Sequence, residues 1–215
     1  MLELYIGNKC FSSWSLRPWL VLKHHEIPFT EIFIRLRQPD TPAQILEVSP
    51  SGRLPVLHHD GRRIWDTLAI LEYLAELYPE KKLWPDDRTA RAIARSVSAE
   101  MHSGFMEVRS QWGMNLRRRK AHKPLSEAGR KQAARIEQIW RECRAEYGAG
   151  GSFLFGSFTA ADAMYAPVAT RFDTYGGELA AATRAYVDAI LAMPAMKVWY
   201  AGAAAETYPE PGPDE

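Results

Sequence analysis

The stretch that decides the fold is Ser51-Gly52-Arg53-Leu54-Pro55-Val56-Leu57, followed by a turn at Asp60-Gly61 and by Ile64-Trp65. Two apolar runs on either side of an Asp-Gly turn predict an antiparallel hairpin. A proline at the entry of a strand has two explanations, an edge strand or a cis peptide bond before Pro55, and this motif alone leaves both open. The cis geometry would leave the Leu54 backbone available to pair with an extended peptide ligand.

On both sides of this hairpin the hydrophobic pattern changes repeatedly between the strand and the helix period. The pattern upstream predicts a strand at 2–6, a helix around 16–22, a strand over 29–36 and a short helix from Thr41-Pro42 to Val48, with Thr41 as its N-cap. Downstream, Asp66-Thr67 opens a helix with one apolar face, and Tyr78-Pro79 ends it. The order β-α-β-α-β-β-α is that of a thioredoxin-like domain, which we place at residues 1–80.

After a linker at 81–87, strand signals nearly vanish and helical patterns dominate. We therefore predict an all-α helical-bundle domain at residues 88–208 and a proline-rich tail at 209–215. Thr159 lies three residues before Asp162, a spacing that predicts a capping box and the start of a core helix. Breaks between helices are expected at Pro124, Gly148 to Gly151, Gly176-Gly177 and Pro194.

The composition restricts the classes of function. The 215 residues include 27 basic and 26 acidic side chains, so no overall field points to a nucleic acid partner. No run reaches the roughly 18 apolar residues of a membrane span. Two cysteines cannot build a disulfide framework and the first residues lack a signal-peptide pattern, so we expect a cytoplasmic protein. Adjacent histidines at 24–25 and 58–59 point in different directions, and no metal site is expected.

Residues 10–15, Cys-Phe-Ser-Ser-Trp-Ser, stand where the first strand turns into the first helix. A thioredoxin-like domain places reactive groups there because the unpaired N–H groups of the helix start stabilise negative charge. The turn has no C-x-x-C pair, which disfavours dithiol exchange. A hydroxyl of Ser12 or Ser13 could instead donate a hydrogen bond to a bound thiolate and lower the pKa of that thiol. The alternative is that these serines only cap the helix.

Asp66-Thr67 is a further candidate anchor. At a helix start, backbone N–H groups and the Thr67 hydroxyl can hold a carboxylate, while Asp66 can hold an ammonium group. The plain alternative is that this pair is simply a good helix start. Together with the serine turn and Leu54-Pro55, it would bind a short peptide at its backbone and at a charged amino-acid end, with a thiol beside the serines. Glutathione fits that description.

Three stretches resemble the cytosolic glutathione S-transferases, namely 12–17 (SSWSLR), 49–57 (SPSGRLPVL) and 66–74 (DTLAILEYL). The second and third resemble the family patterns G-x-[VL]-P-x-L and [ED]-[ST]-x-A-I. The first is similar to the serine-using zeta class, the maleylacetoacetate isomerase-like enzymes, whose motif reads S-S-C-S-x-R. Trp14 stands where that class has cysteine. The resemblance extends over the full chain and implies the glutathione S-transferase fold.

The resemblance implies a homodimeric detoxification enzyme, a glutathione transferase that uses glutathione as co-substrate against a small hydrophobic electrophile. Ser13 aligns best with the activating serine of the family, and Ser12 is the close second. The implied glutathione-binding residues are Gln38, Arg53, Leu54, Pro55, Asp66 and Thr67. The expected electrophile site comprises Trp14, His102, Phe105, Arg109 and Trp112.

Three alternatives stay open at this point. The chain could be a glutathione-dependent isomerase or dehalogenase, or a non-catalytic binding module of the same fold. His102 could be an ordinary residue of a helix surface. The identity of the electrophile does not follow from the sequence, because it depends on which helical side chains converge.

Overall fold

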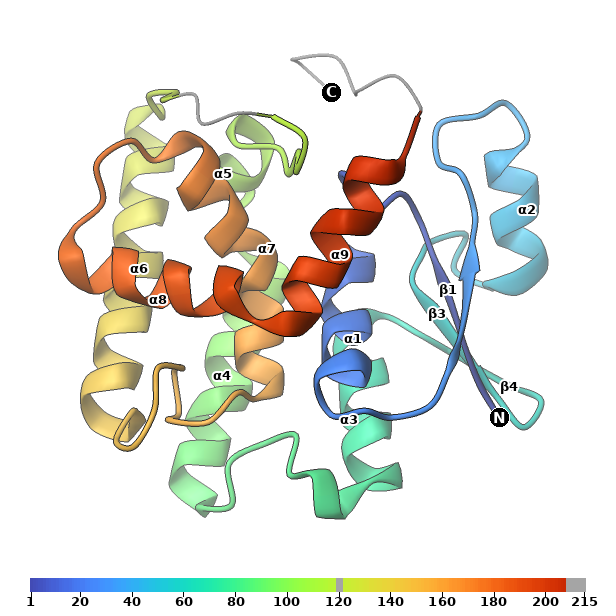
Figure 1. The fold of residues 1–215 in the computed structure, drawn as a ribbon, viewed down its shortest axis with the longest axis horizontal. Helices are drawn as coiled ribbons and strands as arrows, with labels where there is room; N and C mark the ends of the chain where they lie inside the picture. Colours follow the sequence, from blue (N-terminus) through green and yellow to red (C-terminus); the bar gives the residue numbers. More distant parts are fainter. Residues whose placement is uncertain (119–121, 208–215) are drawn as a thin grey trace.

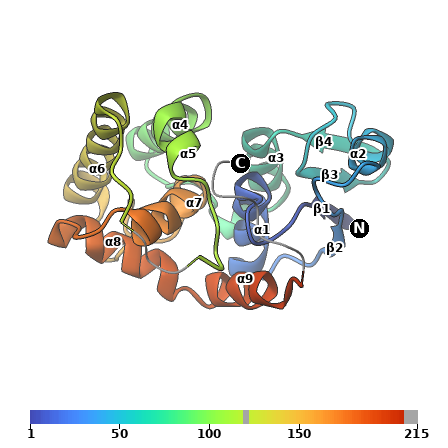
Figure 2. The ribbon, with the colours of Figure 1, turned by 90° about the horizontal axis from the view of Figure 1, so that it is seen from above.

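The computed structural model describes residues 1–118 and 122–207. A small sheet with its own helices forms one side of the molecule, and a bundle of longer helices forms the other (Figure 1). Seen from above, α1 and α3 lie between the sheet and the bundle (Figure 2). The tail predicted at 209–215 lies outside the described residues.

The first half of the chain follows the predicted order of strands and helices, which is confirmed. Its elements are β1 (Leu2–Ile6), α1 (Ser13–His24), β2 (Thr30–Phe33), α2 (Thr41–Val48), β3 (Val56–His59), β4 (Arg62–Trp65), α3 (Thr67–Leu77) and the short 3-10 helix η1 (Pro79–Lys81). The sheet has the order β2-β1-β3-β4. Strand β1 is parallel to β2 and antiparallel to β3, and the predicted β3–β4 hairpin pairs Val56 with Trp65. The sheet is therefore mixed, as a thioredoxin-like domain requires.

Two local predictions need correction. Helix α2 includes Thr41, and Asp40 rather than Thr41 is its N-cap. The Thr41 hydroxyl is used elsewhere, because it donates to the carbonyl of Arg35 at 2.6 Å and accepts from the N–H of Gln38 at 2.9 Å. The strand predicted over 29–36 is also shorter, since only Thr30–Phe33 pair with β1.

The second half is helical, as predicted. Its helices are α4 (Arg88–Ser103), α5 (Met106–Gln111), α6 (Glu127–Tyr147), α7 (Ala160–Tyr175), α8 (Ala181–Ala192) and α9 (Pro194–Ala205). Gly148 and Gly176 directly follow α6 and α7, α9 begins at Pro194, and Pro124 lies in the connection between α5 and α6. No helix within residues 1–118 and 122–207 is long and apolar enough to cross a membrane.

Helix α7 is the centre of the bundle, and its start is built as the sequence predicts. The capping box of Thr159 and Asp162 is present, with the N–H of Thr159 donating to the Asp162 carboxylate at 2.9 Å. Asp162 is fully buried and also accepts hydrogen bonds from the N–H of Leu154 at 3.0 Å and the hydroxyl of Tyr186 at 3.1 Å. Burial raises the pKa of its carboxyl group to about 6, and these hydrogen bonds oppose the rise. The Asp162 side chain therefore fixes α7 to the loop before it and to α8.

The two halves share one continuous hydrophobic core. Helix α1 packs against the sheet on one side and against α7 on the other (Figure 2). Trp19 of α1 meets Trp199 of α9 edge to face, with ring centroids 4.9 Å apart. The junction between sheet and bundle is thus packed as firmly as a domain interior, and side chains from both halves are held in place where they meet.

Candidate active site

A cavity of about 240 Å³ lies at the junction between the two halves of the chain. It is lined by Trp14, Ser51, Arg53, Leu54, Pro55, Trp65, Asp66, Thr67, His102 and Arg109. The predicted anchors at Leu54-Pro55 and Asp66-Thr67 therefore meet at one place, together with three predicted electrophile-site residues, Trp14, His102 and Arg109. Ser51 and Trp65 were not among the predicted site residues, although Ser51 begins the stretch 51–57 that carries Leu54-Pro55 and Trp65 directly precedes Asp66.

Of the two explanations for Pro55, an edge strand or a cis peptide bond, the structure has the cis peptide bond at the entry into β3. The peptide bond between Leu54 and Pro55 is cis, and β3 begins only at Val56. The edge-strand explanation is therefore wrong. Leu54 and Pro55 both line the cavity, which places this backbone turn where a ligand can reach it.

Asp66 and Thr67 form the start of α3 at the cavity wall. Asp66 has a left-handed φ of 72° and is the N-cap residue, with its Oδ1 accepting from the N–H of Leu68 at 2.9 Å. Its Oδ2 lies 2.5 Å from Nε2 of His102 on α4. Thr67 is buried, and its hydroxyl donates to the carbonyl of Trp14 at 3.4 Å. The helix start thus presents a carboxylate and the positive end of the α3 dipole to the same cavity.

The serine turn lies beside this cavity. Ser12 is the N-cap of α1 and Ser13 is its first residue, and each is 9% exposed. The hydroxyl of Ser12 shares a hydrogen bond of 2.8 Å with that of Ser15. The Ser13 hydroxyl makes no hydrogen bond within the described part of the chain. Neither Ser12 nor Ser13 lines the cavity, whereas the next residue, Trp14, does.

Trp14 is the residue that differs from the motif S-S-C-S-x-R, which the sequence otherwise resembles at 12–17. Its ring lies 4.1 Å from the guanidinium carbon of Arg17 and 4.8 Å from that of Arg109. The ring of His102 meets it at a centroid distance of 5.2 Å. One indole therefore contacts cationic groups from α1 and α5 and an imidazole from α4.

Neither cysteine offers an alternative nucleophile. Both are buried. The thiol of Cys10 donates to the side-chain oxygen of Asn115 at 3.3 Å. Burial raises the pKa of the Cys143 thiol to about 12, so this thiol stays protonated at neutral pH.

Besides Ser12 and Ser13, three further predicted site residues lie outside the cavity wall. The Gln38 side chain donates to the carbonyl of Arg37 at 3.0 Å. Phe105 is buried in the core at the start of α5. Trp112 is also buried, and its indole N–H donates to the carbonyl of Lys123 at 2.8 Å. Their roles in ligand binding stay predictions, because side chains can move when a ligand binds.

The adjacent histidines at 58–59 have other partners. Nε2 of His58 lies 2.8 Å from the carbonyl of Val48, and Nδ1 of His59 lies 2.7 Å from the Tyr73 hydroxyl. Among the residues that the structure describes, no three histidine, cysteine or acidic side chains form a group that could hold a metal ion.

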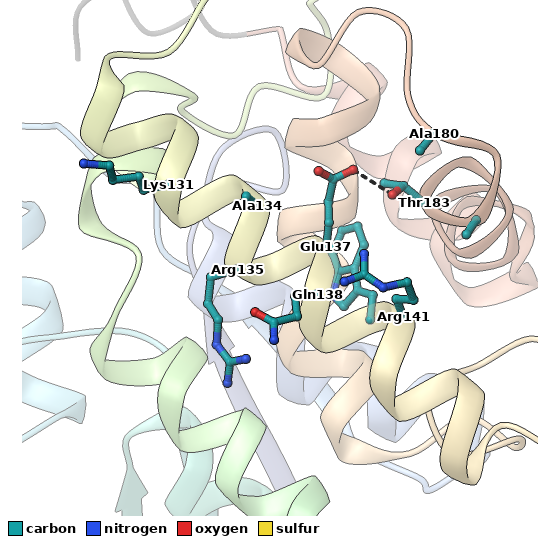
Figure 3. Close-up of a pocket in the computed structure, with 10 residues that line it drawn as sticks. Lys131, Ala134, Arg135, Glu137, Gln138, Arg141, Ala180 and Thr183 are labelled. Atoms are coloured by element: carbon teal, nitrogen blue, oxygen red, sulfur yellow. Dashed lines mark hydrogen bonds between the residues drawn. The ribbon is translucent and has the colours of Figure 1, made fainter.

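A larger cavity of about 630 Å³ lies between α6 and the start of α8 (Figure 3). Its wall includes Lys131, Arg135, Glu137, Gln138, Arg141 and Thr183. The Thr183 hydroxyl donates to the Glu137 carboxylate at 2.7 Å, so that carboxylate is already engaged. None of the predicted anchors reaches this cavity. We therefore place the candidate active site at the smaller cavity, where the groups with a chemical role converge.

The fold and the cavity define a thioredoxin-like domain joined to a helical bundle, with a ligand site where they meet. The family model for the glutathione S-transferase N-terminal domain matches residues 11–77, and the model for the C-terminal domain matches residues 87–202. The chain belongs to the glutathione S-transferase family.

Curated relatives include a probable maleylacetoacetate isomerase from Caenorhabditis elegans, 32% identical over 108 residues, which are 50% of this chain and 49% of the relative. Another is glutathione S-transferase omega-1 from Rattus norvegicus, 29% identical over 151 residues, 70% of this chain and 61% of the relative. The chain thus spans about half the length of the first relative and 61% of the second.

Among solved structures, a glutathione transferase homolog from Burkholderia gl BGR1 with bound glutathione superposes with a TM-score of 0.74 at 25% identity. The alignment covers 95% of this chain and 99% of that one. Glutathione transferase Omega 3C from Trametes versicolor has a TM-score of 0.68 at 21% identity, with 91% and 86% of the two chains covered. This second likeness supports the fold alone.

Proposed function

We propose that the chain is a glutathione transferase that binds glutathione in the cavity at the junction and activates its thiol with the hydroxyl of Ser13. The observation that carries this proposal is the convergence of Leu54-Pro55, Asp66-Thr67 and the start of α1 around one cavity. The solved Burkholderia homolog with bound glutathione supports the choice of ligand.

The sheet side of the cavity has groups for the central peptide unit and for the charged γ-glutamyl end of the tripeptide. The backbone of Leu54 pairs with the central peptide unit, as in strand addition. The Asp66 carboxylate holds the ammonium of the γ-glutamyl end, and the N–H groups at the start of α3 with the Thr67 hydroxyl hold its carboxylate. This pairing matches opposite charges and satisfies the groups that the helix start leaves unpaired.

The sulfur is placed at the start of α1, where the helix dipole favours a thiolate. The Ser13 hydroxyl is the better donor because it makes no hydrogen bond within the described residues, whereas that of Ser12 is shared with Ser15. A hydrogen bond to the thiolate that lowers the thiol pKa by one to two units corresponds to about 1.4–2.7 kcal/mol. The thiolate then attacks the electrophilic carbon, a carbon–sulfur bond forms, and the leaving group departs with its electron pair.

The test is a comparison of Ser13→Ala with Ser12→Ala. Calorimetry with glutathione should give similar dissociation constants for both variants and the wild type, because the anchors are intact. Turnover of glutathione with methyl 4-chloro-3-nitrobenzoate should fall roughly 10- to 100-fold in Ser13→Ala only. Unchanged turnover in both variants would remove the serine from the mechanism. If millimolar glutathione gives no heat of binding, the interpretation as an enzyme would give way to that of a non-catalytic binding module.

A glutathione-dependent isomerase is the second candidate, and the curated relatives named maleylacetoacetate isomerase favour it. In that reaction the thiolate adds to the substrate and leaves again, so glutathione is regenerated rather than consumed. Product analysis that shows an isomerised substrate and a constant glutathione concentration would favour the isomerase over the transferase.

We also propose that the chain forms a homodimer, as the family resemblance implies. Light scattering coupled to gel filtration measures this directly. A mass near twice the 24.4 kDa of the chain supports the dimer, and a mass near 24.4 kDa overturns it.

A further inference from the structure

Arg17 and Arg109 lie over the ring of Trp14, and a third arginine, Arg171, lies close enough to both for their charges to interact. Arg17 belongs to α1, Arg109 to α5 and Arg171 to α7. Arg17 is fully buried and Arg171 is 4% exposed, while Arg109 lines the cavity. We call these three side chains the arginine cluster.

The buried members of the cluster have donors without acceptors. Arg17 donates from Nε to the carbonyl of Met164 at 2.9 Å and from Nη1 to that of Ser13 at 3.2 Å, but its Nη2 has no partner among the described residues. Nε and Nη1 of Arg171 are likewise buried without a partner. Buried donors in folded proteins nearly always have a partner, and an unpaired one is costly. Unpaired guanidinium nitrogens in two neighbouring side chains indicate that an acceptor belongs here.

The cluster also lacks compensating negative charge. Burial lowers the pKa of Arg17 well below its ordinary value, and the charges of Arg171 and Arg109 lower it further. Burial, followed by the charge of Arg109, lowers the pKa of Arg171 to about 10. Asp66 is the one carboxylate among the described residues that raises the pKa of Arg17, and its oxygens already bind Leu68 and His102.

Other arginines of the same chain show what a paired guanidinium looks like here. Arg135 donates from Nε and Nη2 to the two carboxylate oxygens of Glu100 at 2.8 and 3.0 Å, and this hydrogen bonding raises its pKa. Arg95 does the same with Glu72 at 2.8 Å for both bonds. The guanidinium groups of Arg95 and Arg135 thus pair with carboxylates at the surface. The buried guanidinium groups of the arginine cluster lack such a pairing, although leaving a charge unpaired costs more free energy when it is buried.

We propose that the arginine cluster holds a negatively charged group, in the simplest case a carboxylate, on the electrophile that reacts with glutathione. Arg109 makes the direct contact, because it is the member that lines the cavity, and Arg17 and Arg171 supply positive charge behind it. A planar guanidinium fork matches the two oxygens of a carboxylate. This inference rests on the proposed function. It also replaces the hydrophobic electrophile expected from the sequence with an anionic one.

The reaction suited to a test is aromatic substitution. The glutathione thiolate attacks the chlorine-bearing carbon of 4-chloro-3-nitrobenzoate, a carbon–sulfur bond forms, and chloride leaves with the electron pair of the broken bond. The thiol proton passes to water, and no oxidant or reductant is needed. The methyl ester of the same compound has the same reactive carbon without the charge. The ratio of kcat/KM for the acid to that for the ester therefore isolates recognition of the anion.

The wild-type protein should favour the acid over the ester by about 10-fold or more, the effect of one charge-assisted hydrogen-bonded pair. Arg109→Gln should lose this preference, and Arg109→Lys should retain part of it, because lysine keeps the charge without the fork. Arg141→Gln removes the same charge from an exposed position on α6 and should leave the preference unchanged (Figure 3). Equal wild-type rates for acid and ester, or an unchanged ratio in Arg109→Gln, would overturn the inference.

A binding measurement without glutathione separates this inference from the proposed function. Benzoate titrated into the protein should give heat in the wild type and in Arg141→Gln, but none in Arg109→Gln, and benzyl alcohol should give none in any of them. If neither electrophile is converted, this pattern still supports the anion site while the transferase reaction is rejected. Absence of benzoate binding in the wild type rejects the anion site, whatever the rate with the ester.

Discussion

The two walls of the cavity are built in different ways. The sheet wall, formed by Leu54, Pro55, Asp66 and Thr67, consists of a backbone turn and a helix start. The helical wall consists of the long side chains of His102 and Arg109, with Arg171 behind them, and each comes from a different helix. The sheet wall is thus set by local turn and capping chemistry. The helical wall depends on how α4, α5 and α7 pack.

This difference matches the two ligands of the proposed reaction. Backbone groups and a helix start cannot vary much with side-chain substitution, and they suit a co-substrate that is always the same. Side chains on packed helices can vary without disturbing the fold, and they suit the electrophile. The walls should therefore respond differently when each is perturbed.

The largest effect should follow from loosening the helix that supports the helical wall. Asp162→Ala leaves the buried donors of Leu154, Thr159 and Tyr186 unpaired at the start of α7. We expect a loss of roughly 3 kcal/mol or more in the free energy of unfolding, measured by urea denaturation. Asp188→Ala is the control, because within residues 1–118 and 122–207 this exposed side chain pairs only with Arg184, and its loss should cost about 1 kcal/mol or less. Equal losses in both variants would contradict a special role for Asp162.

The next largest effect should come from the sheet wall. Asp66→Asn removes the charge proposed to hold the ammonium of glutathione, while asparagine still caps α3. Calorimetry should show glutathione binding weakened roughly 10- to 100-fold with little loss of stability. Asp60→Asn, in the turn between β3 and β4, is the matched control and should bind like the wild type. An unchanged dissociation constant for glutathione in Asp66→Asn would show that the Asp66 carboxylate does not bind the ammonium group.

A smaller effect on glutathione affinity is expected when the contact between His102 of the helical wall and Asp66 of the sheet wall is removed. His102→Ala removes the 2.5 Å interaction with Asp66. The side chains of His102 and Asp66 are both partly exposed. Partly exposed ion pairs contribute little, so glutathione affinity should stay within about threefold of the wild type. Ser103→Ala, on the next residue of α4, serves for comparison. A larger loss of affinity would assign His102 to glutathione binding as well as to the helical wall.

The smallest effect should come from the larger cavity between α6 and α8. Thr183→Val removes the hydrogen bond to Glu137 that Figure 3 shows. Turnover with either nitrobenzoate substrate should equal that of the wild type, because no reacting group lies there. A changed kcat/KM would mean that this second cavity acts on the site at the junction.

Much of the sheet wall could be predicted because its signals are local. Pro55 entering a strand predicted two geometries, and Asp66-Thr67 predicted a helix start with ligand-holding groups, all within short stretches of chain. The break positions between helices and the capping box at Thr159 are local in the same sense, and the structure confirms them.

The helical wall was only partly predictable. Of the four electrophile-site residues that the sequence predicted in the helical half, His102 and Arg109 line the cavity, whereas Phe105 and Trp112 are buried elsewhere. A helical period identifies an apolar face but not which partner covers it. Arg171 gave no signal at all, since a single arginine within a helix is usually on the surface.

The sequence by itself determined the order of strands and helices, the cis turn as one of two possibilities, the capping box of α7 and the family. These follow from backbone sterics, hydrogen bonding over a few residues and hydrophobic periodicity, which are written into short segments. Only the tertiary structure decided that Arg17, Arg109 and Arg171, from positions far apart in the chain, lie close together, and that donors of Arg17 and Arg171 have no partner among the described residues. The interaction between charged side chains depends on how far burial excludes water from them and on the distance between them. Burial and distance are both properties of the packed molecule, not of a short segment of sequence.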